Sequence, residues 1–174
     1  MSSDELLLIQ RAKKGDTLAL ARLHDAYFPL IYRFFYYRMD NPDLIGDLTA
    51  GTFSRMVERL QTYKVESMKF LPWLYMLAKS LMMETLLERG TPYKKTLPAI
   101  TATDREPPLS ANRMKSLLCH LSIEERDVLI GKLIERRSTR DVAREIGRSV
   151  PAVKALQRQG LRHLRQLLPP GEPA

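Results

Sequence analysis

The chain has 174 residues, a length that allows one large domain or two small ones. Apolar residues make up 44% of it and charged residues 28%, which excludes a wholly disordered protein. No apolar run reaches the ~18 residues of a transmembrane helix, and the acidic start lacks the pattern of a secretory signal, so we expect a cytoplasmic protein. The single cysteine, Cys119, excludes an internal disulfide, and three scattered histidines form no local metal motif.

The net charge of +8 is distributed unevenly along the chain. Residues 1–90 carry 12 basic and 11 acidic side chains, a balance of +1, whereas residues 91–174 carry 16 and 9, a balance of +7. A strongly basic half favours a polyanionic partner, most often a nucleic acid. A membrane surface and a merely solvated basic face are the alternatives.

Residues 1–90 show apolar side chains at three- and four-residue steps, which predicts a small helical bundle. Asn41 and Pro42 mark a helix start, with Asn41 as the N-cap. The aromatic cluster within residues 27–37 is interpreted as core plus a partner interface. The predicted apolar stripes are Leu20, Leu23, Tyr27, Ile31 and Phe34; Leu44, Leu48, Val57 and Leu60; and Phe70, Trp73, Leu74, Leu77 and Leu81.

A proline-rich segment without apolar periodicity separates the two halves of the chain. It carries Pro92, Pro98, Pro107 and Pro108, and a helix cannot continue through such a segment. We therefore predict an all-α protein of two small helical domains, 1–90 and 110–174, joined by a linker over 91–109. Residues 169–174 are predicted to form a frayed tail.

The second half contains three helix-start signatures. Ser122 with Glu125 forms a capping box, after which Val128, Leu129 and Leu133 are predicted to face inward. Ser138 and Ser149 are predicted to cap two further helices, one ending at Gly147 and the other near residue 168. Cys119 is interpreted as a buried, unreactive side chain.

Residues 139–158 have the pattern of a helix-turn-helix. Small Ala143 permits close packing, Gly147 makes the turn, and Val142, Ile146, Val153 and Leu156 fill the interior. The second helix is predicted to present base-reading side chains, namely Ser149, Pro151, Ala152, Lys154, Gln157 and Arg158. Nine basic residues lie between Arg136 and Arg165, and those predicted to bind the DNA backbone are Arg140, Arg144, Arg148 and Arg162. A plain helical hairpin with a solvated basic face is the competing interpretation.

Across residues 5–168 the chain resembles the extracytoplasmic-function (ECF) sigma factors, the two-domain branch of the bacterial sigma-70 family. The N-terminal matches are Arg11-Ala12, Gly15-Asp16, Tyr32-Arg33-Phe34, Asp47-Leu48-Thr49, Thr52-Phe53, Phe70 and Trp73-Leu74-Tyr75. The C-terminal matches are Leu121-Ser122, Glu125-Arg126, Val142-Ala143, Ile146-Gly147, Ser149-Val150 and Val153-Lys154.

This resemblance implies an N-terminal domain that binds core RNA polymerase and the −10 promoter element, and a helix-turn-helix domain that binds the −35 element. The implied −10 residues are Tyr63, Lys64, Glu66, Ser67, Lys69, Lys79 and Ser80. The implied polymerase-binding residues are Asp47, Ala50, Gly51 and Phe53. Members of the family are often silenced by an anti-sigma factor, which makes one a candidate partner.

The chain departs from the family pattern at three of these positions. The usual Asp-Leu-Thr-Gln-Glu-Thr-Phe stretch has Ala50 and Gly51 in place of Gln and Glu, and Ser80 stands where Asn is usual. By resemblance, this helix contacts the polymerase clamp. Ala50 and Gly51 lack the polar groups that make those contacts in the family. Gly51 also weakens a helix by roughly 0.5–1 kcal/mol relative to alanine.

No phosphate-binding glycine loop, paired-carboxylate motif or metal cluster indicates an enzyme, so we expect no catalytic residue, cofactor, metal, membrane or small-molecule substrate. The predicted function is promoter recognition for transcription initiation. One alternative is a helix-turn-helix regulator, or degenerate sigma-like protein, that binds duplex DNA without driving initiation. A purely protein-binding helical adaptor is another, and salt-dependent DNA affinity distinguishes it.

Overall fold

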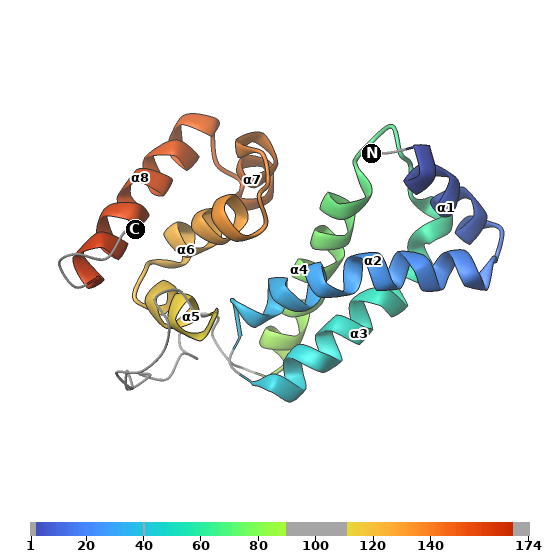
Figure 1. Cartoon of the computed structure of the whole chain (residues 1–174), viewed down its shortest axis with the longest axis horizontal. Helices are drawn as coiled ribbons and strands as arrows, with labels where there is room; N and C mark the ends of the chain where they lie inside the picture. The colour runs from blue at the N-terminus through green and yellow to red at the C-terminus, as the bar shows by residue number, and fades with distance from the viewer. Residues whose placement is uncertain (1–2, 40, 90–110, 169–174) are drawn as a thin grey trace. The chain divides into compact units, whose positions relative to one another are not determined.

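The computed structural model describes residues 3–39, 41–89 and 111–168, and this part of the chain is helical without a strand (Figure 1). The predicted all-α fold is confirmed. The chain divides into two compact units, an N-terminal unit of Met1–Lys95 and a C-terminal unit of Thr96–Ala174. The predicted linker over 91–109 and the predicted tail over 169–174 lie outside the described residues.

The N-terminal unit is built from α1 (Ser3–Lys13), α2 (Thr17–Tyr36), α3 (Pro42–Arg59), the 3-10 turn η1 (Leu60–Thr62) and α4 (Phe70–Glu88). Helix α2 packs against α1, α3 and α4, and α3 also packs against α4. Their apolar faces form one core that includes Leu23, Ile31, Phe34, Leu48, Phe70, Leu74 and Leu77. The three predicted stripes therefore meet in a single small bundle, with one exception.

The exception is Val57, which was predicted to face inward and is instead 50% exposed. Val57 follows Leu48 by nine residues, and at about 100° per residue that spacing places the two side chains on opposite sides of a helix. Met56 and Phe53 occupy the buried positions of this part of α3. The prediction joined two stripes of the same helix that do not share a face.

Side-chain caps fix the starts of α2 and α3. The Asp16 carboxylate accepts a hydrogen bond from the Ala19 N–H at 3.1 Å. The Asn41 side-chain oxygen accepts from the Asp43 and Leu44 N–H groups at 3.0 and 3.1 Å, which confirms the predicted cap. These bonds satisfy amides that the first helical turn leaves without a partner.

The C-terminal unit contains α5 (Ala111–Cys119), α6 (Ile123–Leu129), the π-helical turn η2 (Ile130–Ile134), α7 (Thr139–Ile146) and α8 (Val150–Leu167). Helix α6 packs against α8 and α7. The predicted capping box is present: Ser122 Oγ accepts from the Glu125 N–H at 3.3 Å, and a Glu125 carboxylate oxygen accepts from the Ser122 N–H at 3.0 Å. The box sets where α6 begins, and with it the face that α6 buries.

Two expectations for this unit are wrong. Leu133 is 45% exposed, because the π-helical turn changes the register after Leu129 and buries Ile130 and Gly131 instead. Cys119 is only partly buried, and its thiol donates to the Lys115 carbonyl at 2.9 Å, one turn back on α5. Among the described residues no helix has the length and apolar content needed to span a membrane.

The Asn41 cap makes a testable contribution to stability. Replacing Asn41 with Ala removes the acceptor of two amide hydrogen bonds, and we expect the free energy of unfolding of the N-terminal unit to fall by ~1 kcal/mol. Trp73 is the single tryptophan of the chain and is buried in this unit, so urea unfolding followed by its fluorescence measures the change. Asn41→Asp keeps the acceptor and should behave as the wild type; an equal loss in both variants would contradict the capping role.

Candidate functional site

Helices α7 and α8 of the C-terminal unit form the predicted helix-turn-helix arrangement. Gly147 ends α7 in the left-handed region at φ 67°, a conformation that favours glycine. The Arg148 N–H bonds to the Ala143 carbonyl at 3.0 Å, and Ser149 Oγ accepts from the Ala152 N–H at 3.3 Å to start α8. The turn between the helices is therefore closed by its own backbone.

Apolar packing orients α8 against α7. Val142, Ala143 and Val153 are buried together with Val128 of α6, as the sequence predicted for the first three. Ile146, Val150 and Leu156 pack around them. Because Val153 is fully buried, the residues on the other side of the first two turns of α8 are turned to solvent.

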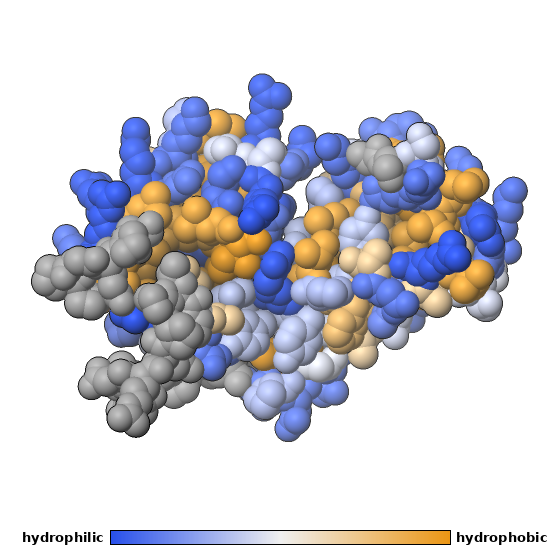
Figure 2. Space-filling view, viewed as in Figure 1, coloured by the Kyte–Doolittle hydropathy of each residue, from blue (hydrophilic) through white to orange (hydrophobic). Residues whose placement is uncertain are grey.

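The solvent side of α8 carries most of the predicted base-reading residues. Ser149, Pro151, Lys154 and Arg158 are exposed, while Ala152 and Gln157 are partly buried. Arg158 and Arg162 line a depression on the surface of α8 with Leu161 and Arg165. Figure 2 shows hydrophilic side chains standing along this helix. The arrangement presents a basic surface on one helix whose other side is anchored in a core.

Two of the nine arginines and lysines of this region have carboxylate partners. Arg148 forms an exposed ion pair with Glu124, at 2.5 Å between a guanidinium nitrogen and the carboxylate. Exposed pairs of this kind are worth little in water, so a phosphate can replace Glu124 at small cost. Arg140, Arg144 and Arg162 are exposed. All four predicted backbone-binding arginines thus lie on the surface.

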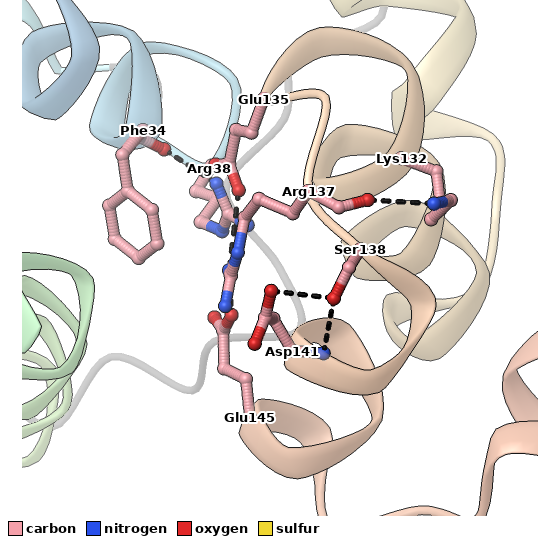
Figure 3. A network of polar contacts seen from close by, with 8 residues as sticks. All are labelled: Phe34, Arg38, Lys132, Glu135, Arg137, Ser138, Asp141 and Glu145. Carbon is pink, nitrogen blue, oxygen red and sulfur yellow. Dashed lines mark hydrogen bonds and ion pairs between the residues drawn. The ribbon is translucent and has the colours of Figure 1, made fainter. Parts of the chain in front are cut away.

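Arg137 is a structural residue that the sequence interpretation counted only as part of the basic surface. Its side chain is 8% exposed and forms ion pairs with Glu145 of α7 and with Glu135, the latter at 3.4 Å (Figure 3). The Lys132 ammonium donates to the Arg137 carbonyl at 2.7 Å. These contacts tie the end of η2 to α7. Only the fold could reveal them, because Glu145 lies eight residues away on another element.

The predicted polymerase-binding residues of α3 do not share one surface. Asp47 and Ala50 are exposed on α3. Phe53 is 6% exposed and packs on His24 of α2, with ring centroids 4.6 Å apart, so it belongs to the core rather than to the exposed surface of α3. A Cβ added at Gly51 would lie 2.9 Å from the end of the Leu81 side chain, so Leu81 of α4 occupies the space beside Gly51.

An aromatic row on α2 is more exposed than the sequence interpretation implied. Phe28, Tyr32 and Tyr36 follow one another at four-residue steps, with stacked rings whose centroids lie 6.1 and 6.4 Å apart. Phe28 is 39% exposed and Tyr32 38%. Phe28 also stacks on Phe53 of α3, 6.3 Å away, so the first ring of this row packs against α3. Large aromatic side chains that are partly exposed to solvent are typical of protein interfaces.

The predicted −10 loop, residues 63–69, is organised around a buried tyrosine. Tyr63 is 3% exposed, and its ring packs on Phe70 and Trp73 at centroid distances of 5.3 and 4.7 Å. Burial, together with the Glu5 and Glu66 carboxylates, raises the pKa of Tyr63 to about 12. The phenol therefore stays protonated and donates to the Met68 carbonyl at 2.7 Å. The exposed side chains of the loop are Lys64, Glu66, Ser67 and Lys69.

On α4, Lys79 is partly buried and Ser80 is exposed. The Ser80 hydroxyl donates to the Glu84 carboxylate at 2.9 Å, and Arg55 of α3 binds the same carboxylate through both of its terminal nitrogens. Bonds from Arg55 and then Ser80 lower the pKa of Glu84 to about 2. Ser80 is thus part of a link between α3 and α4 that the sequence did not predict.

Comparison with known proteins agrees with this arrangement of helices. Residues 23–90 match the sigma-70 region 2 family. An ECF RNA polymerase sigma factor, BldN of Streptomyces coelicolor, is 27% identical to the chain over 171 residues, which are 93% of this chain and 65% of BldN. The chain is therefore similar to the extracytoplasmic-function group of the sigma-70 family. It spans slightly less than two thirds of the length of this ECF relative.

Two solved structures share the helical fold of this chain. CnrH, solved with the cytosolic domain of CnrY, is 20% identical with a TM-score of 0.65 over 92% of this chain and 94% of CnrH. RpoE of Bartonella quintana, solved with the anti-sigma factor NepR, is 17% identical with a TM-score of 0.71 over 87% of this chain and 98% of RpoE. The sequence matches support the predicted resemblance, and these structures agree with the helical fold.

The ion pairs of Arg137 predict a specific loss of stability. Arg137→Met removes the guanidinium that Glu135 and Glu145 share in a largely buried position, and we expect the C-terminal unit to lose about 2–4 kcal/mol. Amide hydrogen exchange of peptides from α7 and α8 measures the loss. Arg140→Met removes a nearby exposed arginine and should leave exchange unchanged; equal protection in both variants would contradict a structural role for Arg137.

Proposed function

We propose that this protein is an RNA polymerase sigma factor that joins the core enzyme, recognises promoter DNA and directs initiation, without catalysing a reaction itself. The observation that carries the proposal is the basic, solvent-facing start of α8 behind a tight turn and a packed α7. A helix presented in this way enters the major groove and reads bases with its first turns. The similarity to sigma factors makes promoter DNA the expected target.

In this proposal the C-terminal unit reads the −35 element. Lys154 lies one turn before Gln157 and Arg158 on α8, and all three carry hydrogen-bond donors that suit base edges. Arg140 and Arg144 of α7 bind phosphates next to the groove, and Arg162 does so further along α8. Arg148 joins them by exchanging Glu124 for a phosphate. The excess of positive charge in residues 91–174 supports the same division of labour.

The N-terminal unit is proposed to dock on core polymerase through α3 and the adjoining part of α2. Asp47 and Ala50 supply the exposed surface of α3, and the aromatic row Phe28, Tyr32 and Tyr36 extends it. RpoE was solved with an anti-sigma factor, so a similar inhibitor is a candidate partner of this chain. We propose a cytoplasmic location, where core polymerase and promoter DNA are found.

The same unit is proposed to hold the opened −10 strand on the loop 63–69. Lys64 and Lys69 supply charge for phosphates, and Glu66 and Ser67 supply polar groups for an unpaired base. Tyr63 supports the loop from the core and does not stack on a base. Lys79 and Ser80 of α4 lie on the neighbouring helix, where Ser80 has to exchange its bond to Glu84 for one to DNA.

Gly51 favours a second function, because it carries no side chain for a partner and the Leu81 side chain packs beside it within the unit. Together with Ala50, it leaves α3 without the polar pair of the family pattern. The chain in that case is a helix-turn-helix regulator, or a degenerate sigma-like protein, that binds duplex DNA without driving initiation. DNA binding that needs no core polymerase and supports no transcript distinguishes this alternative.

The recognition surface predicts two different effects on DNA binding. If Arg158 contacts a base, Arg158→Ala weakens promoter binding by ~1–3 kcal/mol and changes preference at one or two −35 positions. Arg144→Ala removes a phosphate contact, so it weakens all sequences alike and lowers the salt dependence by about one charge. Titrations of wild type and both variants at several salt concentrations measure this. Unchanged binding in both would exclude α7 and α8 as the DNA-reading surface.

The α3 surface predicts opposite effects on polymerase affinity. Ala50→Gln restores one polar group of the family pattern at an exposed position, and we expect core polymerase to bind more tightly by ~1 kcal/mol. Asp47→Ala should weaken binding. Gly51→Glu, which the sequence pattern also suggests, requires Leu81 to move and serves poorly as a restoration. Affinities measured at one salt concentration check the pair, and no change in either variant would remove α3 from the interface.

A further inference from the structure

The loop 63–69 is held at both of its ends by one residue. At its start the Tyr63 N–H bonds to the Leu60 carbonyl at 3.2 Å, and at its end the Tyr63 hydroxyl bonds to the Met68 carbonyl at 2.7 Å. Between them the Ser67 N–H closes a turn on the Lys64 carbonyl at 3.1 Å. Val65 and Met68 pack on the core. These bonds and contacts fix the backbone of the loop, from which its exposed side chains project to solvent.

Helix α1 contacts the loop 63–69 at Tyr63, the first residue of the loop. The Lys13 ammonium, at the end of α1, donates to the Tyr63 carbonyl at 2.5 Å and lies 5.8 Å from the centre of the Tyr63 ring. Gln61 of η1 returns a bond from its side-chain amide to the Lys13 carbonyl, also at 2.5 Å. Two reciprocal bonds thus join segments that lie about 50 residues apart in the chain.

Helix α1 is itself fixed to the body of the unit. Glu5 accepts a hydrogen bond from the Tyr27 hydroxyl of α2, and Ile9 and Ala12 are buried in the core. The Tyr27 ring packs edge-on against Phe70, 5.2 Å away, at the start of α4. The core therefore holds α1 in place. Because Lys13 binds the Tyr63 carbonyl, the loop is held at that carbonyl as well.

We infer that Lys13 is a positioning residue for single-strand binding by the loop 63–69, and that α1 holds this loop in its binding conformation before DNA arrives. A loop fixed in advance avoids the entropy cost of ordering its side chains on a ligand. The Lys13 bond is charge-assisted, which makes it stronger than a neutral bond to the same carbonyl. The inference rests on the proposed function for its DNA-binding part only.

The experiment compares Lys13→Met, Lys13→Arg and the control Lys14→Met. Lys14 is exposed and directly follows α1, so its replacement removes the same charge one residue along the chain. Two quantities are measured on the full chain: hydrogen exchange of amides within 60–69, and affinity for a single-stranded oligonucleotide carrying a −10 sequence, with core polymerase present. Core affinity is measured in parallel.

We expect Lys13→Met to speed exchange within 60–69 and to weaken oligonucleotide binding about 3- to 10-fold, the range for the loss of one hydrogen bond of ordinary net strength. Lys13→Arg should restore both, and Lys14→Met should change neither beyond a small salt-dependent loss. Core affinity should be unchanged in all three. Unchanged exchange in Lys13→Met overturns the inference. If exchange responds while the wild type binds no oligonucleotide, the positioning of the loop stands and the proposed −10 role fails.

Discussion

The functional surfaces of this chain depend on where its helices begin, because a one-residue shift of a helix start turns its faces by about 100°. Five helices of the described part start at a side chain that accepts a hydrogen bond from the first turn, and these caps are Asp16, Asn41, Ser122, Ser138 and Ser149. Each cap fixes the first residue of its helix so that the apolar stripe faces the core of its unit. With Ser149 in place, Val153 points inward and Lys154 points to solvent.

Local signals of this kind explain why much of the fold was predictable. A serine or asparagine cap, a proline at the first turn and a glycine in the left-handed region act within a few residues, so the starts of α3, α6, α7 and α8 could be derived from sequence. The exposure of Leu133 could not be derived in this way, because the π-helical turn η2 interrupts the α-helical period and has no local sequence signature. Val57 was misplaced by joining two stripes that lie on opposite sides of α3.

The site was predictable only where exposure follows from the helical period. Lys154 and Arg158 lie about 100° and 140° around α8 from the buried Val153, so their exposure could be inferred. Phe53 could not be placed, since its burial depends on His24 and Phe28 of another helix. The same holds for the pairing of Gly51 with Leu81 and of Arg137 with Glu145. Each joins residues from two elements, and no pattern along the chain encodes such a contact.

The two units differ in the chemistry that they expose. Residues 1–90 are nearly neutral, and the N-terminal unit presents an aromatic row on α2, a surface suited to protein, together with the polar loop 63–69. The C-terminal unit presents arginine and lysine on α7 and α8, a surface suited to phosphate and base edges. The proposed function, binding a polymerase and a promoter at once, needs both surfaces.

Run-off transcription with purified core polymerase tests this account most directly. Core enzyme is incubated with a library of genomic fragments, with and without the chain, and transcript starts are mapped. The account predicts discrete starts that appear only when the chain is present, preceded at a fixed distance by shared −35 and −10 sequences, and that disappear when α8 carries Lys154→Ala with Arg158→Ala. Specific binding of the chain to duplex DNA with no transcript from any fragment would contradict it.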